Sequence, residues 1–128
     1  MIYLDSSVAL AAILAEPRRP SPAFWQQQLT SSRLLEYEVV NRLNVRGLAV
    51  AANVQLQAVL TATHFIDMTP NVLARALQPF PVPVRTLDGL HLATMEFLRR
   101  QGQTVELATY DRRLEAAAVA LGFALAPV

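Results

Sequence analysis

Short apolar runs alternate with helix signals along most of this chain, and that alternation is the feature that most limits what the chain can fold into. The helix signals are capping residues before apolar segments and glycines after them. Short strands separated by helices favour a parallel sheet, because parallel neighbours need a long connection and a helix usually supplies it. The sequence therefore predicts an α/β fold, a parallel β-sheet flanked by helices on both faces, with right-handed crossovers.

The expected strands are Met1–Leu4, Phe65–Met68, Thr104–Ala108 and Phe123–Leu125. The expected helices are Val8–Ala15, Phe24–Leu29, Leu34–Arg46, Ala51–His64, one that begins at Thr69 and Pro70, Leu87–Arg100 and Arg112–Leu121. Ser6 and Ser7 are expected to cap the first helix, and the polar run Thr30–Ser32 to end the second. No repeat or linker interrupts these segments, so a single domain over residues 1–128 is predicted.

Two residue types are missing from the 128 residues: there is no cysteine, and all eleven basic side chains are arginine. Without cysteine, disulfides, thiolate metal sites and cysteine nucleophiles are excluded. Without lysine, a P-loop lysine and a Schiff-base lysine are excluded, and receiver or phosphatase folds that need a lysine beside their aspartates are disfavoured.

The apolar segments are too short for a membrane protein. The longest stretch without a polar side chain, Ala116–Val128, contains a glycine and a proline and cannot span a bilayer. No basic leader precedes Asp5, so a cytoplasmic protein is expected. The apolar fraction of 53% exceeds the usual share, which predicts an interface with a second copy or with a partner.

Three aspartates fall where predicted strands lead into predicted helices. Asp5 ends the first strand, Asp111 follows the strand that ends at Ala108, and Asp88 begins the long helix Leu87–Arg100. Each alone reads as a helix cap or first-turn acid favoured by the helix dipole. Together they would share one edge of a parallel sheet and repel one another unless a cation lay between them. Carboxylates suit Mg²⁺ or Mn²⁺, so the pattern predicts a divalent-metal site.

Glu38 is a candidate fourth acid, because it lies in a helix apolar enough for one acid to face inward. The alternative is an ordinary surface pair with Arg42 at i+4. Asn41 and Arg42 are candidates to orient Glu38 or to reach a phosphate, and the alternative is that they belong to a solvated helix face. His91, in an apolar helix, is expected to be a packed core residue.

Four segments resemble the acidic motifs of the PIN-domain ribonucleases, and most of all those of the VapC toxins. They are Tyr3-Leu4-Asp5-Ser6-Ser7, Ser32-Arg33-Leu34 leading to Glu38, Leu87-Asp88-Gly89-Leu90-His91-Leu92-Ala93-Thr94, and Thr109-Tyr110-Asp111-Arg112-Arg113-Leu114. The resemblance extends over the whole chain in order and spacing. The proline-rich loop from Glu16 to Ala23 has no counterpart in the family pattern.

The resemblance implies a PIN fold and an Mg²⁺- or Mn²⁺-dependent endoribonuclease, the toxin of a type II toxin–antitoxin pair. It implies that the catalytic and metal-binding residues are Asp5, Glu38, Asp88 and Asp111, accompanied by the hydroxyl of Thr109. It also implies an RNA substrate, a small cognate antitoxin and a homodimer. A catalytically silent PIN-like module that binds RNA or a protein is the alternative. Phe24 and Trp25 are read either as an antitoxin contact or as core, and Asp67 is expected on an edge strand outside the site.

Overall fold

The computed structural model describes all residues from Met1 to Val128 and contains one sheet of five strands in the order β3-β2-β1-β4-β5. All four pairs of neighbouring strands are parallel. The strands are β1 (Ile2–Leu4), β2 (Leu29–Ser32), β3 (Thr63–Ile66), β4 (Glu106–Ala108) and β5 (Ala124–Leu125).

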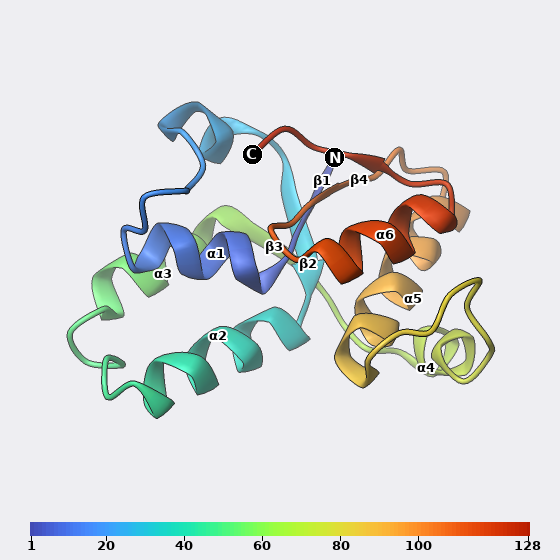
Figure 1. Ribbon diagram of the computed structural model, residues 1–128, viewed down its shortest axis with the longest axis horizontal. Coiled ribbons are helices and arrows are strands. Elements are labelled where there is room, and N and C mark those ends of the chain that lie inside the picture. The colour runs from blue at the N-terminus through green and yellow to red at the C-terminus, as the bar shows by residue number, and fades with distance from the viewer.

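Six α-helices and one 3₁₀ helix connect the strands and cover both faces of the sheet. In Figure 1, α1, α2 and α3 lie on one side of the strands, and α4, α5 and α6 lie on the other. No helix is both long and apolar enough to cross a membrane. The predicted α/β fold, with a parallel sheet and helices on both faces, is confirmed. The helices are α1 (Ser6–Ile13), η1 (Pro22–Gln26), α2 (Leu34–Val45), α3 (Asn53–Ala62), α4 (Pro70–Ala76), α5 (Thr86–Arg100) and α6 (Arg112–Ala120).

The alternating side chains of β1 divide the apolar core into two parts. Ile2 and Leu4 pack with α1, α2 and α3 in a cluster of 15 buried residues. Tyr3 points to the other face, where it packs with α5 and α6 in a cluster of 10. A strand buried on both faces in this way is typical of the centre of a parallel sheet. The central strand is therefore fixed from both sides, and so is the residue that follows it.

The interpretation of Thr30–Ser32 as the polar end of a helix is wrong. Leu29–Ser32 forms β2 and is buried at every position, and the preceding helical turn is the short η1. The hydroxyls of this strand have partners inside the protein: Thr30 donates to the His64 carbonyl at 2.9 Å and Ser31 to the Leu4 carbonyl at 2.7 Å. Hydroxyls that are hydrogen-bonded can be buried without a large penalty in free energy, so a polar segment can form an inner strand of the sheet.

Three helix ends can be compared with the residues predicted for them. Ser6 and Ser7 do not cap α1, because the helix already begins at Ser6 and Asp5 is its N-cap. Thr69 caps α4 with Pro70 in its first turn, as predicted. The helix expected to run to His64 ends at Ala62, and β3 begins without a loop at Thr63.

Candidate active site

The strands β1 and β4 are neighbours at the centre of the sheet, and the chain leaves them toward opposite edges. In such open parallel sheets, ligands bind beyond the carboxyl ends of the strands where the strand order reverses. Leu4 pairs with Ala108 across the two strands, and the Asp5 N–H donates to the Ala108 carbonyl at 3.0 Å. Asp5 and Thr109 are therefore the next pair, and they lie at this switch point.

A pocket of about 480 Å³ opens at this edge of the sheet, and all four predicted acids line it. They come from four separate parts of the chain: the end of β1, the middle of α2, the first turn of α5 and the N-cap of α6. The remaining side chains of the pocket include three hydroxyls and two arginines. The lining residues are Asp5, Ser6, Ser7, Leu10, Glu38, Arg42, Arg85, Thr86, Leu87, Asp88 and Asp111.

Asp5 is the most buried of the four acids, and hydroxyl donors hold its carboxylate in place. Its Oδ2 accepts from the Ser7 hydroxyl at 2.6 Å and from the Thr109 hydroxyl at 2.8 Å. Ser7 and Thr109 in turn accept from the backbone N–H groups of Tyr110 and Asp111, each at 2.9 Å. Both hydroxyls donate to Oδ2, so the second oxygen of Asp5 remains available to a ligand.

Arg85 joins Asp88 and Asp111. Its guanidinium donates to Asp88 Oδ2 at 2.8 Å and also to Asp111 Oδ2. Burial raises the pKa of Asp88, and the bond from Arg85 only partly opposes that effect. Burial acts in the same direction on Asp111, but Arg85 together with the backbone N–H groups of Arg113 and Leu114 outweighs it and lowers the pKa of Asp111. The positive guanidinium of Arg85 thus lies between these two carboxylates and partly balances their charge.

Glu38 faces inward, while its neighbour Glu36 is more exposed, with side-chain exposures of 17% and 46%. Its Oε1 contacts Nε2 of His91 and its Oε2 accepts from the Ser6 hydroxyl at 3.4 Å. No ion pair joins Glu38 to Arg42, so the surface-pair alternative is wrong. His91 is buried as predicted, at 1% exposure, but it also reaches the candidate site.

The four acids suit a divalent ion chemically, because carboxylate oxygens are the ligands that Mg²⁺ and Mn²⁺ prefer. No three acidic or histidine side chains surround a single point in this arrangement. Two of the carboxylates are bridged by Arg85 and one is bound to His91. The guanidinium acts as a stand-in cation between Asp88 and Asp111, so a metal that uses these two acids must displace it.

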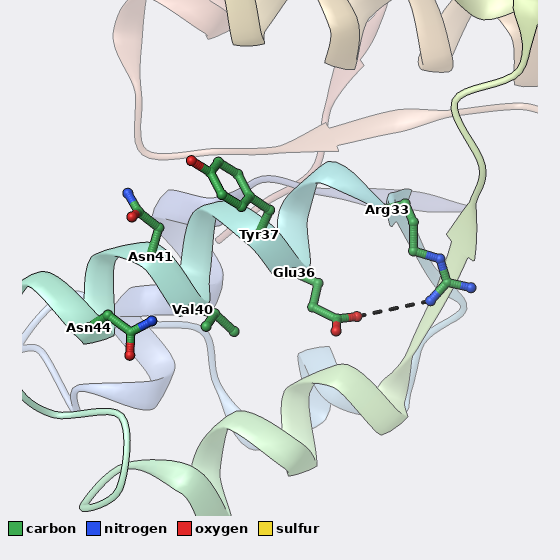
Figure 2. A pocket seen from close by; sticks show the side chains of 6 residues that line it. All are labelled: Arg33, Glu36, Tyr37, Val40, Asn41 and Asn44. Atoms are coloured by element: carbon green, nitrogen blue, oxygen red, sulfur yellow. Dashed lines mark ion pairs between the residues drawn. The ribbon is translucent and has the colours of Figure 1, made fainter.

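Asn41 does not take part in this site, whereas Arg42 does. Figure 2 shows Asn41 with Tyr37 and Asn44 among the side chains of a second pocket along α2, which also contains the Arg33–Glu36 ion pair. Successive helix residues point about 100° apart, so neighbours in sequence can line different pockets. The hypothesis that Asn41 orients Glu38 is therefore wrong, and Arg42 is the arginine of α2 that lines the acidic pocket.

Asp67 lies outside the site, as expected. It follows β3, the edge strand, which is two strands away from β1. Its side chain is 77% exposed and its Oδ1 lies 3.4 Å from Nε of Arg33. A strand-end aspartate is thus not enough to join the cluster, because the strand must also lie at the switch point.

Sequence reasoning missed Arg85 and the role of Ser7. Arg85 stands three residues before Asp88, and an i, i+3 arginine and aspartate pair at a helix start is a usable signal. Its second bond, to Asp111, depends on tertiary structure. The sequence predicts Ser7 as a helix cap, yet its hydroxyl bridges Asp5 and the backbone of Tyr110.

Comparison with known proteins assigns a family. The PIN domain model matches residues 2–120. "Ribonuclease VapC46" of Mycobacterium tuberculosis is 32% identical, over 97% of this chain and 95% of that protein. "Ribonuclease VapC35" of the same species is 29% identical, over 98% of this chain and 95% of that protein.

A solved structure shares the fold. The structure titled "Toxin-antitoxin complex from Klebsiella pneumoniae" superposes with a TM-score of 0.66 at 17% identity and covers 94% of both chains. At that identity the likeness concerns the fold alone. The family model and the full-length relatives establish that the chain belongs to the PIN-domain family, with VapC ribonucleases among its relatives.

Proposed function

We propose that this protein is a metal-dependent endoribonuclease that acts as the toxin of a type II toxin–antitoxin pair. The observation that carries the proposal is the convergence of Asp5, Glu38, Asp88 and Asp111, from four separate parts of the chain, on one pocket at the switch point. Two relatives named as ribonucleases, which align over nearly the whole chain, support RNA as the substrate. The structural neighbour titled as a toxin–antitoxin complex is consistent with the toxin role.

The candidate metal ligands divide into two groups. Asp5 and Asp88 are the principal ligands in this proposal, and Glu38 and Asp111 complete the set directly or through water. Mg²⁺ or Mn²⁺, when bound, would supply hydroxide near neutral pH and stabilise the charge that develops on the phosphate oxygens. Ser7 and Thr109 donate to Asp5 Oδ2, so the other oxygen of Asp5 would be the one to bind the ion. Arg42, an exposed residue that lines the pocket, is the proposed contact for an RNA phosphate.

One feature favours the second candidate, a catalytically silent module. Three of the four acids already have partners, Arg85 or His91, and a silent domain would keep such contacts. Incubation of the purified chain with RNA, with and without Mn²⁺, separates the two functions. Mn²⁺-dependent cleavage supports the nuclease, whereas RNA binding without cleavage supports the silent module.

The antitoxin is proposed to cover an apolar pocket beside Trp25. Phe24 is core, at 4% exposure, whereas Trp25 lines a pocket of about 260 Å³ between α1, η1 and α3. Six of the seven lining residues are hydrophobic, a composition suited to an apolar side chain of a partner. The lining residues are Ala12, Ile13, Trp25, Gln55, Ala58, Val59 and Ala62.

Trp25→Ala is expected to weaken binding of the cognate antitoxin by at least about tenfold, since buried tryptophans are frequent interface hot spots. Isothermal titration of toxin with antitoxin measures the change. Leu77→Ala is the control, because Leu77 is 88% exposed and ends α4 on the opposite face of the sheet. Equal affinities for Trp25→Ala and the wild type would place the antitoxin elsewhere.

A homodimer is proposed from the apolar side chains left on the surface. Four of them lie on α2, α3 and the turn between these helices: Tyr37, Val45, Val50 and Val54, each at least 62% exposed. Large apolar side chains left exposed in this way commonly mark an interface. Multi-angle light scattering at micromolar concentration is expected to give twice the chain mass of 14.1 kDa. A single 14.1 kDa species would contradict the dimer.

A further inference from the structure

His91 has both ring nitrogens engaged inside the protein. Its Nδ1 lies 2.8 Å from the Tyr3 hydroxyl, and its Nε2 contacts Oε1 of Glu38. The Tyr3 and His91 rings meet edge to face, with centroids 5.7 Å apart. Tyr3 is fully buried and His91 is 1% exposed, so neither side chain is free to turn toward water. This chain of contacts runs from the central strand through α5 to the candidate metal ligand on α2.

The hydrogen bonds determine which nitrogen of His91 carries the proton. The Ser32 backbone N–H donates to the Tyr3 oxygen at 3.0 Å, so that oxygen already accepts one bond. The phenol proton of Tyr3 then needs an acceptor, and Nδ1 of His91, 2.8 Å from the hydroxyl oxygen, can accept it. Nδ1 is thereby the acceptor of the Tyr3 hydroxyl, and the Nε2–H of His91 donates to Glu38.

This fixed donor orients the carboxylate of Glu38. Oε1 receives a bond from a side chain that cannot rotate, and Oε2 is left with the long 3.4 Å bond from Ser6 at the pocket. Bonds to a charged acceptor are about twice as strong as neutral ones, and fully satisfied buried networks are rigid. Hydrogen-bond partners of metal ligands orient those ligands in general, and their loss typically costs about 10- to 100-fold in metal affinity.

We propose that Tyr3 and His91 are positioning residues. With the Ser32 backbone N–H they form a buried chain of hydrogen bonds, called the relay below, that holds the Glu38 carboxylate in position to bind a divalent ion. The inference rests on the proposed metal-dependent function, and it assigns His91 no contact with RNA. His91 therefore acts through Glu38, and what matters is the donor at the position of Nε2 rather than the imidazole itself.

Two amide substitutions separate positioning from packing. The nitrogen of glutamine can reach the place of Nε2, whereas the shorter asparagine ends near the place of Nδ1 and cannot reach Glu38. We expect His91→Asn to weaken Mn²⁺ binding, followed by electron paramagnetic resonance titration without RNA, by about 10- to 100-fold. His91→Gln is expected to recover most of that loss. His64→Asn is the control, because His64 is an exposed residue of the edge strand β3.

Equal losses of Mn²⁺ affinity in His91→Asn and His91→Gln would mean that His91 acts by packing, and would overturn the inference. Cleavage of RNA by the wild type would in that case still support the proposed function. A wild-type chain that neither binds Mn²⁺ nor cleaves RNA would overturn the proposed function and this inference together.

A measurement on the unaltered protein covers the case in which the variants fail to fold. The chain has two histidines, so nitrogen-15 labelling of histidine gives two ring systems to observe by NMR, and His64→Asn identifies the signals of His91. We expect Nε2 of His91 to carry the ring proton and Nδ1 to accept from the Tyr3 hydroxyl. A proton on Nδ1, on both nitrogens or exchanging between them would overturn the relay.

Discussion

Asp5→Asn is expected to lower Mn²⁺-dependent RNA cleavage by at least about a hundredfold while the protein stays folded. Loss of a hydrogen-bond partner of a metal ligand already costs about 10- to 100-fold, and loss of the charge of a principal ligand costs more. A hundredfold corresponds to about 2.7 kcal/mol of transition-state stabilisation. Asp88→Asn is expected to have an effect of the same size. Cleavage of a labelled RNA with saturating Mn²⁺, at matched enzyme concentrations, measures both.

The fold should survive Asp5→Asn because asparagine replaces each structural role of the aspartate. Asp5 is the N-cap of α1, where asparagine and aspartate are equally good. The amide oxygen can take the place of Oδ2 and accept from Ser7 and Thr109, with the amide nitrogen at the open side. The substitution also removes one negative charge from a cluster of four acids. The melting temperature without metal is therefore expected to stay near that of the wild type.

Asp67→Asn is the matched control. It is the same chemical change at a strand end, but at an exposed residue beside β3, two strands from β1. Cleavage should be unaffected and the free energy of unfolding should change by no more than about 0.5 kcal/mol, as for most surface substitutions. If Asp5→Asn cut RNA at the wild-type rate, Asp5 would not be a ligand. If folded Asp67→Asn lost activity, the active edge of the sheet would be misplaced.

The positions of the acids were predictable because they follow from topology. Once β1 and β4 are parallel neighbours, Asp5 and Thr109 must adjoin, since Leu4 pairs with Ala108. The same reasoning places Asp67 outside the acidic site, because β3 lies at the edge of the sheet. What the sequence did not reveal was β2, whose buried Thr30 and Ser31 hydroxyls donate to carbonyls of neighbouring strands. Hydropathy registers the polarity of such residues but not the partners that satisfy them.

The partners of the acids were less predictable than their positions. His91 and Glu38 are 53 residues apart, and Arg85 and Asp111 are 26 apart. Each contact depends on how two helices are placed against the sheet, which local patterns of charge do not encode. The i+4 spacing of Glu38 and Arg42 pointed to a surface pair, yet the buried imidazole is the partner because Glu38 faces inward. Tertiary packing here overrides a local preference worth about 0.5 kcal/mol or less.

Glu96→Ala is expected to lower the free energy of unfolding by about 3 kcal/mol, the largest stability effect predicted for this protein. Glu96 on α5 forms an ion pair with Arg75 on α4, and the two side chains are 10% and 11% exposed. Removing one partner leaves the other charge poorly solvated, which costs far more than the intact pair contributes. Arg75 cannot easily escape to water, because it also stacks on Phe80 at 4.2 Å and donates to the Gln78 carbonyl at 3.2 Å.

Glu36→Ala is the matched control for that prediction, since both changes remove a helix glutamate paired with an arginine. The Arg33–Glu36 pair is 3.9 Å apart, and its side chains are 55% and 46% exposed. Exposed pairs of this kind contribute about 0.5 kcal/mol or less. Urea unfolding followed by circular dichroism compares the two variants. If both variants lost the same small amount of unfolding free energy, apolar contacts such as those of buried Val72 would hold α4 to α5. The Arg75–Glu96 ion pair would then not be what fixes α5, the helix that carries Asp88 and His91.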